Sequence, residues 1–203
     1  ESNYVFIDTN NLKKRFKSSN KFLIAELGFG SGLNFLNTWK LWLKVKKENA
    51  ILNYVSFERQ PLSKSQLNKI LKKFKVLDNF TNLLISKLPL RTTGIHEIFF
   101  EIGNVNLILV YDDFDYIKKL NFEADSWFLD GFSPSKNKSA WSIELMKQVF
   151  KNTKFYGTFS TFTSSSNVQK KLKSVGFEIF KKKGFNQKRE MVFGFKKKSV
   201  NQF

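Results

Sequence analysis

Three glycines, Gly28, Gly30 and Gly32, stand at every second position after the apolar run 22–27 and directly before an amphipathic segment. Glycine in a strand-to-helix turn lets the backbone approach a ligand closely, because it has no Cβ and tolerates positive φ. The spacing is G-x-G-x-G, whereas dinucleotide-binding turns read G-x-G-x-x-G. Glu26 precedes the turn, and its carboxylate would repel a pyrophosphate but suit a cationic ligand. The turn therefore favours a sulfonium cofactor, S-adenosylmethionine, over NAD.

Acidic residues also end two further apolar runs. Glu58 follows the run 51–57, and a carboxylate at this place hydrogen-bonds ribose hydroxyls in nucleoside-binding α/β folds. Asp112 and Asp113 follow the run 105–111, where either could accept a hydrogen bond from an adenine amino group. Each signal is weak by itself, since carboxylates after strands commonly cap helices. Together, at the ends of consecutive strands, they predict a bound adenosyl cofactor.

Asp130 is the candidate for the reacting end of the site. Within the strand-like run 126–132 it stands where the apolar residues stop, after Leu129, while Phe132 offers an aromatic face and Pro134 stiffens the loop. An alkylamine with a pKa of about 10.4 is mostly protonated at neutral pH, so its methylation needs an outlet for a proton. We predict that the Asp130 carboxylate orients and deprotonates an amine while an aromatic ring stacks on a base. The structural alternative is an aspartate that caps the next element.

The elements that must position these residues alternate between strand and helix. We expect strands at 22–27, 51–57, 105–111, 126–132 and 157–162, and helices at 33–45, from Ser63 onward, at 140–150 and at 165–175. Ser63 and Gln66 form a capping-box pattern. This alternation predicts an open, mostly parallel α/β sheet covered on both faces. Two final strands, 177–183 and 189–198, predict an antiparallel edge at the C-terminal end.

Composition limits the class of protein. The 203 residues, 41% of them hydrophobic, suffice for one ordinary core, so we expect a single domain over 1–203 with residues 1–20 as an N-terminal extension. The absence of cysteine excludes disulfides and any thiolate nucleophile, including the one that methylation of pyrimidine carbon requires. With one histidine, His96, no metal site is expected, and we expect His96 to be structural and to precede a strand. Without a long apolar run or signal-peptide pattern, a cytoplasmic protein with no membrane partner is expected.

The net charge of +18 is placed unevenly. Residues 170–198 carry eleven Lys or Arg against two Glu, a net +9 and half of the total. Such clustering favours a nucleic-acid partner ahead of an anionic membrane. The alternative is a lysine-rich, solvated surface, because charge alone does not name a partner.

Several blocks of the sequence are distinctive in combination. They are "YVFIDTNNLKKRF", "ELGFGSGLNFLNTW", "SFERQPLS", "WFLDGFSPSKNKSAW", "GTFSTFTSSSNVQKKLKSVGF" and "KGFNQKREMVFG", in this order along nearly the whole chain. Together they resemble the methyltransferase domain of the bacterial tRNA 5-methylaminomethyl-2-thiouridine biosynthesis protein. The glycine turn alone is shared by a very broad superfamily, whereas the "LDGF-x-P-x-KN" block and the "KGF-x-x-KREM" tail are specific to this family.

The resemblance implies a class I S-adenosylmethionine-dependent methyltransferase with a Rossmann-like fold, acting on the exocyclic aminomethyl group of the wobble uridine in certain tRNAs. By position, the cofactor would be held by Glu26, Gly28, Phe29, Gly30, Gly32, Asn34 and Glu58. Asp113 or Asp112 would meet adenine, although the family usually has Gly-Asp at these two positions, and Asp130 would face the amine. The tRNA anticodon stem-loop would be contacted by Phe132, Pro134, Lys183, Lys188 and Arg189.

The resemblance also implies a flavin-dependent oxidase, fused or separate, that prepares the aminomethyl uridine; this chain would be a stand-alone form or an excised part. Two other functions stay open: a further adenosyl-dependent transferase, such as a polyamine aminopropyltransferase, and a nucleic-acid-binding module without catalysis. The basic exterior argues against the first, because a cationic polyamine gains nothing from it. The glycine turn with Glu26, Glu58 and Asp130 argues against the second.

Overall fold

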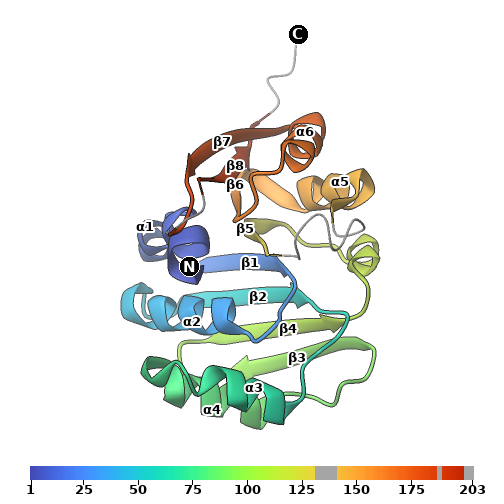
Figure 1. Cartoon of the computed structure of the whole chain (residues 1–203). Helices are drawn as coiled ribbons and strands as arrows, with labels where there is room; N and C mark the ends of the chain where they lie inside the picture. Colours follow the sequence, from blue (N-terminus) through green and yellow to red (C-terminus); the bar gives the residue numbers. More distant parts are fainter. Residues whose placement is uncertain (131–140, 187–188, 199–203) are drawn as a thin grey trace.

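The fold is described from a computed structural model, which covers residues 1–130, 141–186 and 189–198. Within these residues, eight strands form one sheet in the spatial order β3-β4-β2-β1-β5-β6-β8-β7 (Figure 1). The strands are β1 (Lys21–Leu27), β2 (Ile51–Phe57), β3 (Gly94–Phe100), β4 (Val105–Tyr111), β5 (Ala124–Leu129), β6 (Thr153–Thr161), β7 (Phe177–Lys183) and β8 (Glu190–Lys196).

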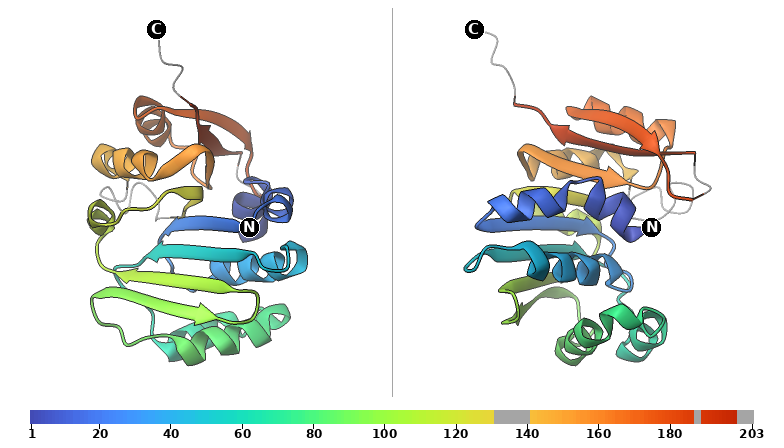
Figure 2. Two further views of the ribbon diagram at one scale, coloured as in Figure 1. Left: turned by 180° about the vertical axis from the view of Figure 1, so that it is seen from behind. Right: turned by 90° about the vertical axis from the view of Figure 1, so that its left-hand side faces the viewer.

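Helices cover both faces of this sheet (Figures 1 and 2). One face carries the π-helix η1 (Asn3–Asp8), α1 (Leu12–Ser18), α2 (Leu33–Val45), α3 (Lys64–Leu71), the 3-10 helix η2 (Lys75–Leu77) and α4 (Asp78–Lys87). The other face carries the 3-10 helix η3 (Phe114–Lys119), α5 (Ile143–Lys151) and α6 (Ser166–Ser174). Each face buries its own hydrophobic cluster, as expected when amphipathic helices pack on a sheet. Of the helices in the described ranges, none is both long and apolar enough to span a membrane.

The strand directions bring several loops to one edge of the sheet. Strands β4, β2, β1, β5 and β6 pair in parallel, whereas β3 is antiparallel to β4, and β8 is antiparallel to both β6 and β7. Strand β7 therefore runs in the same direction as β6, so the turn between β7 and β8 lies at the carboxyl edge of the parallel strands. The predicted α/β class with an antiparallel C-terminal edge is confirmed; the antiparallel edge at β3 was not predicted.

Several local predictions differ from the structure in their boundaries. The capping box at Ser63 and Gln66 is present at the start of α3. Strand β6 begins at Thr153, four residues before the predicted start, and its register with β5 shifts beyond Ala124. His96 lies inside β3 and does not precede a strand; its ring packs on Tyr111 with centroids 4.9 Å apart, which fits a structural role. The strand expected after His96 is present, but it begins at Gly94, before the histidine.

The N-terminal segment, expected as an extension, packs into the core. Val5, Phe6 and Ile7 of η1 are buried, as are Leu12 and Phe16 of α1. The Phe6 ring lies against a phenylalanine of β5 with centroids 5.0 Å apart. This packing fixes the first residues of the chain over the carboxyl edge of the sheet (Figure 2).

Candidate active site

The glycine turn joins β1 to α2 with a backbone that favours glycine. Gly28, Gly30 and Gly32 have φ values of 92°, 52° and 73°. A Cβ added at Gly32 would lie 2.8 Å from Phe29 Cζ, closer than carbon atoms tolerate, and 3.2 Å from Leu84 Cδ2, a tight contact. A Cβ at Gly30 would meet nothing within 4 Å. The turn therefore folds the Phe29 ring inward and presents the backbone at Gly30 to an open space.

That space is a cavity of about 380 Å³ at the carboxyl ends of β1, β2 and β5. The predicted residues that line it are Gly28, Phe29, Gly30, Asn34, Glu58 and Asp130. Ser2 and Phe6 from η1 and its flank, and Phe162 after β6, also line it, although the sequence did not single them out. The cavity thus brings a glycine-rich backbone together with three acidic residues, Glu1, Glu58 and Asp130, and aromatic walls.

Glu58, directly after β2, holds the glycine turn in place by a hydrogen bond. Its Oε2 accepts a hydrogen bond from the Gly30 backbone N–H at 2.9 Å, and its Oε1 accepts one from the Gln60 N–H at 2.8 Å. Its residue exposure is 6%. Each carboxylate oxygen has two lone pairs, so Glu58 can still accept a hydrogen bond from a ligand hydroxyl in the cavity.

Glu26 lies beneath the cavity and is not among its described lining residues. Its side chain is fully buried; Oε1 accepts from Asn34 Nδ2 at 2.9 Å and Oε2 accepts from Ser56 Oγ at 2.8 Å. Burial raises the pKa of Glu26 to about 8, with a further contribution from the negative charge of Asp130. The first residue that we expected to hold a ligand therefore interacts with other protein side chains.

Asn34, in the first turn of α2, connects Glu26 to Asp130. Its Nδ2 also donates to Asp130 Oδ2 at 2.7 Å, and its Oδ1 accepts from Ser2 Oγ at 2.5 Å. Asp130, directly after β5, is half-buried and borders the cavity. The structure therefore places the Asp130 carboxylate on the same side of the sheet as the glycine turn.

The two aspartates after β4 lie apart from this group. Asp113 Oδ1 is 3.3 Å from Arg59 Nη1, with both side chains exposed, and Asp112 Oδ1 accepts from the Asp113 backbone N–H at 2.7 Å. Asp113 lines a second cavity, of about 510 Å³, with Arg59, Phe114 and Ser142. Strand β2 separates β4 from β1 in the sheet, which explains why these carboxylates do not border the first cavity.

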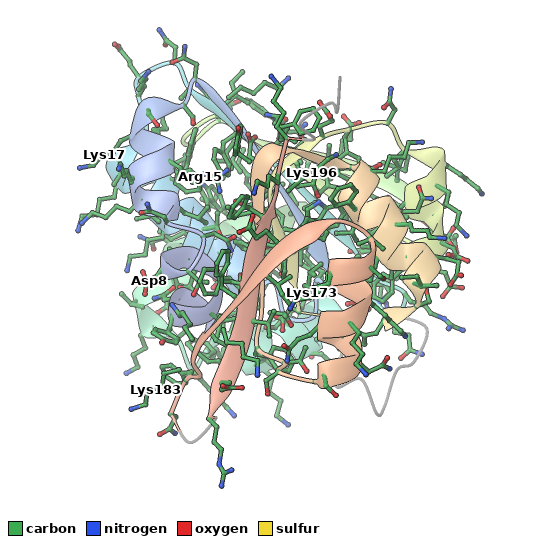
Figure 3. The ribbon with its side chains drawn as sticks, turned by 90° about the horizontal axis from the view of Figure 1, so that it is seen from above. Asp8, Arg15, Lys17, Lys173, Lys183 and Lys196 are labelled. Atoms are coloured by element: carbon green, nitrogen blue, oxygen red, sulfur yellow. The ribbon has the colours of Figure 1, made fainter. Side chains whose placement is uncertain are left out.

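Of the predicted substrate contacts, Lys183 and Arg189 are exposed at the turn between β7 and β8, while Phe132, Pro134 and Lys188 lie outside the described residues. The Tyr4 hydroxyl donates to the Lys183 carbonyl at 2.8 Å, and Lys182 Nζ lies 4.2 Å from the centroid of the Tyr4 ring. Figure 3, which looks onto β7, shows Lys183 at the turn end of the hairpin. The N-terminal segment therefore connects the cavity to a basic turn.

Of the site residues that the sequence analysis missed, some carried a signal in the sequence and others carried none. Phe162 follows β6, so the rule that ligands bind at the carboxyl ends of strands could have identified it. Ser56 had no signal, because only the register of β1 with β2 places it beside Glu26. Ser2 had no signal, and Phe6 stood only within the distinctive block 4–16 with no predicted role, because η1 was not predicted.

Comparison with known proteins assigns the chain to a family. A family described as S-adenosyl-L-methionine-dependent methyltransferase matches residues 75–197, more than half of the chain. The chain belongs to this family. S-adenosylmethionine is accordingly the cofactor of this methyltransferase.

Curated relatives extend the similarity over nearly the whole methyltransferase chain. The tRNA 5-methylaminomethyl-2-thiouridine biosynthesis bifunctional protein MnmC of Marinomonas sp. (strain MWYL1) is 41% identical over 197 residues, which cover 96% of this chain and 29% of the relative. The protein of the same name from Legionella pneumophila (strain Lens) is 40% identical over 211 residues, covering 95% and 32%. The chain thus spans about a third of the length of these relatives.

Solved structures support the class I methyltransferase fold. MnmC2 from Aquifex aeolicus superposes with a TM-score of 0.77 at 24% identity, covering 96% of this chain and 60% of that one. Precorrin-6y C5,15-methyltransferase from Geobacter metallireducens GS-15 gives a TM-score of 0.50 at 14% identity, covering 93% and 89%. The predicted class I S-adenosylmethionine-dependent fold is therefore confirmed.

The residues around the first cavity fit this cofactor. The left-handed backbone at Gly30 borders the cavity without a Cβ, which leaves room for a ligand against the main chain. Glu58 supplies an acceptor for ribose hydroxyls, and the Asp130 carboxylate gives the cavity a negative charge that suits a cationic sulfonium. The phenylalanines at the cavity wall provide an apolar surface.

Proposed function

We propose that this chain transfers the methyl group of S-adenosylmethionine to the exocyclic aminomethyl nitrogen of wobble 5-aminomethyl(-2-thio)uridine in tRNA, giving 5-methylaminomethyl(-2-thio)uridine. The observation that carries the proposal is the Asp130 carboxylate, which borders the same cavity as the glycine turn and Glu58. The printed names of the relatives, at 40% and 41% identity over nearly the whole chain, support the acceptor. A purely binding protein would not need this combination, and the net charge of +18 argues against a transferase that acts on a cationic polyamine.

In this proposal the bound cofactor supplies an electrophilic methyl group on a sulfonium. Gly28, Gly30 and Glu58 hold it through backbone contacts and ribose hydrogen bonds. Asp130 binds the substrate ammonium, orients its nitrogen and accepts the proton that the nitrogen must lose before it can attack carbon. Phe162 and the other aromatic side chains at the cavity exclude water around the reacting atoms.

The substrate tRNA would approach along the turn between β7 and β8. This turn lies at the carboxyl edge of the sheet, and its Lys183 and Arg189 are exposed. We propose that these two residues and Lys188 contact phosphates of the anticodon stem-loop. Phe132 and Pro134 remain proposed base contacts, on sequence grounds alone. Binding by such lysines and arginines should weaken steeply as salt rises.

We propose that a flavin-dependent oxidase prepares the aminomethyl uridine for this reaction. The curated relatives are named bifunctional, and the chain matches only 29% and 32% of their lengths. The oxidase is either fused to this methyltransferase or supplied by a separate protein. A reconstitution with tRNA that carries a longer substituent at uridine C5 tests this: label incorporation should depend on adding such an oxidase.

The experiment that tests the function is incubation with labelled S-adenosylmethionine and tRNA that carries the aminomethyl uridine, followed by nucleoside analysis. We expect label in 5-methylaminomethyl-2-thiouridine or its 2-oxo counterpart. The matched control is Asp130→Asn, which keeps the side-chain shape but removes the base. An unlabelled wobble nucleoside, with cofactor binding demonstrated by calorimetry, would contradict the proposed acceptor.

A further inference from the structure

The carboxamide of Asn34 lies between two carboxylates. Its Nδ2 donates to Glu26 Oε1 at 2.9 Å and to Asp130 Oδ2 at 2.7 Å. Its Oδ1 accepts from the hydroxyl of Ser2. The orientation of this amide is therefore determined by its partners, because the flipped amide would place an oxygen against both carboxylates and an NH₂ group against a hydroxyl that now donates to it.

Glu26 is the buried end of the hydrogen-bonded group formed by Glu26, Asn34 and Asp130. Its side chain is fully buried, and each of its oxygens accepts a hydrogen bond from a protein side chain, Asn34 or Ser56. Asn34 and Asp130 border the cavity, whereas Glu26 is not among the described residues that line it. A ligand in the cavity would therefore meet the amide and Asp130, with Glu26 beneath them.

We propose that Glu26 is a positioning residue, which acts through Asn34 to hold the Asp130 carboxylate in its reactive orientation, and that Glu26 does not bind the charge of the cofactor directly. The inference rests on the proposed function, because it assigns Asp130 as the base. It also changes the role expected for an acidic residue before the glycine turn. The hydrogen bond from Asn34 to Asp130 restricts rotation of that carboxylate, and Glu26 restricts rotation of Asn34.

The electrostatics agree with a role that does not require a charge on Glu26. Burial, aided by the negative charge of Asp130, raises the pKa of Glu26 to about 8. The titratable groups that act on it are Asp130 after β5 and Tyr54 of β2, while α2 contributes the uncharged Asn34. The pKa of Tyr54 is raised well above its usual value by burial and by these carboxylates, so its hydroxyl stays neutral. At pH 7 Glu26 is then mostly protonated, and glutamine mimics its neutral form.

The decisive comparison is between Glu26→Gln and Glu26→Ala in the full chain. Glutamine can accept from Asn34 through its carbonyl oxygen and donate to Ser56, whereas alanine removes both contacts. Loss of positioning in Glu26→Ala should lower kcat by about tenfold to a hundredfold, while the cofactor Kd changes by less than about threefold. Glu26→Gln should rescue most of that loss of kcat. The control is Glu97→Gln, an exposed position on β3 far from the site, which should match the wild-type chain.

Two outcomes would overturn the proposal. A cofactor Kd that rises about tenfold or more in Glu26→Gln, measured by calorimetry without tRNA, would show that the charge of Glu26 binds the cofactor. A kcat in Glu26→Ala equal to wild type would show that Glu26 is not needed to hold the Asp130 carboxylate in its reactive orientation. If the alanine variant does not fold, the cofactor Kd of Glu26→Gln still shows whether the charge of Glu26 binds the cofactor.

A pH titration separates this inference from the proposed function. In ¹³C-carboxyl spectra of the wild-type chain, we expect one glutamate to titrate near pH 8, as burial raises the pKa of Glu26 to about 8, and this signal should be missing in Glu26→Gln. A Glu26 that is fully ionised at pH 7, together with a cofactor Kd that rises about tenfold in Glu26→Gln, would overturn the inference, because a charged Glu26 would then bind the cofactor. These spectra and the calorimetry need no tRNA. If the wild-type chain fails to methylate tRNA, the proposed acceptor is contradicted while the titration still tests Glu26.

Discussion

Two regions at the same edge of the sheet have opposite charge and different surroundings. Around the cavity, the carboxylates of Glu26, Glu58 and Asp130 each accept a hydrogen bond from the protein. At the turn between β7 and β8, the exposed Lys183 and Arg189 place positive charge at the surface. The difference indicates two kinds of recognition: fixed geometry for a small cationic cofactor, and longer-range attraction for a polyanion. Substitutions in the two regions should therefore differ in size and in salt dependence.

The largest effect is expected at Asp130. Replacement by alanine removes the proposed base, so kcat should fall by roughly 10²- to 10⁴-fold. The cofactor Kd should stay within a few fold, since the glycine turn and Glu58 remain. Single-turnover methyl transfer and calorimetry measure the two quantities. Unchanged turnover would remove Asp130 from the mechanism.

Next in size are substitutions in the glycine turn. Gly32→Ala would place a Cβ 2.8 Å from Phe29 Cζ at a φ of 73°, so it should lower the free energy of unfolding by at least about 1 kcal/mol from the left-handed backbone alone. Gly30→Ala carries the same left-handed backbone cost but meets nothing within 4 Å, so it should lose less stability than Gly32→Ala and should also weaken cofactor binding. Thermal unfolding and calorimetry on both variants compare the two positions. Equal loss of stability in the two would contradict the steric argument.

The buried carboxyl should make stability depend on pH. Because burial raises the pKa of Glu26 to about 8, the folded state binds a proton that the unfolded state has released between about pH 4.5 and 8, and stability falls as pH rises through this window. Glu26→Gln removes this penalty. Its Tm should exceed that of wild type by at least about 2 °C at pH 8, with a smaller difference at pH 5. An equal difference at both pH values would argue against the raised pKa.

The smallest and most salt-dependent effect is expected at the hairpin turn. The double substitution Lys183→Ala with Arg189→Ala should weaken tRNA binding and reduce the slope of log K against log salt by about 1 to 2. Lys17→Ala is the control, because Lys17 is exposed on α1 near the opposite edge of the sheet (Figure 3). Filter-binding titrations at several salt concentrations measure the slopes. The same slope in all three proteins would place the tRNA elsewhere.

The site was predictable from sequence wherever it depends on local chain geometry. The glycine turn, Glu58 and Asp130 each follow an apolar strand, and parallel pairing brings the carboxyl ends of such strands to one edge. Asp112 and Asp113 follow the same rule but lie across β2 from the turn, because strand order in the sheet is not sequence order. Their predicted contact with adenine stays a prediction.

The direction in which a side chain points was less predictable than its place along the strand. Glu26 was expected to face a ligand because it precedes the glycine turn, yet the structure directs it to Asn34 and Ser56 beneath the cavity. The N-terminal residues showed no helix or strand periodicity, although residues 4–16 form one of the distinctive blocks, and η1 is a short π-helix. Ser2 and Phe6 reach the cavity only through packing of η1 on the sheet.

The sequence by itself determined the α/β class, the antiparallel C-terminal edge and the glycine turn, because periodicity and backbone preference act between residues a few positions apart. Only the tertiary structure decided the network around Asp130. Its contacts join Asn34 to Glu26 over 8 positions, Ser56 to Glu26 over 30 and Asn34 to Asp130 over 96. Such contacts depend on strand order and register, which local patterns do not encode.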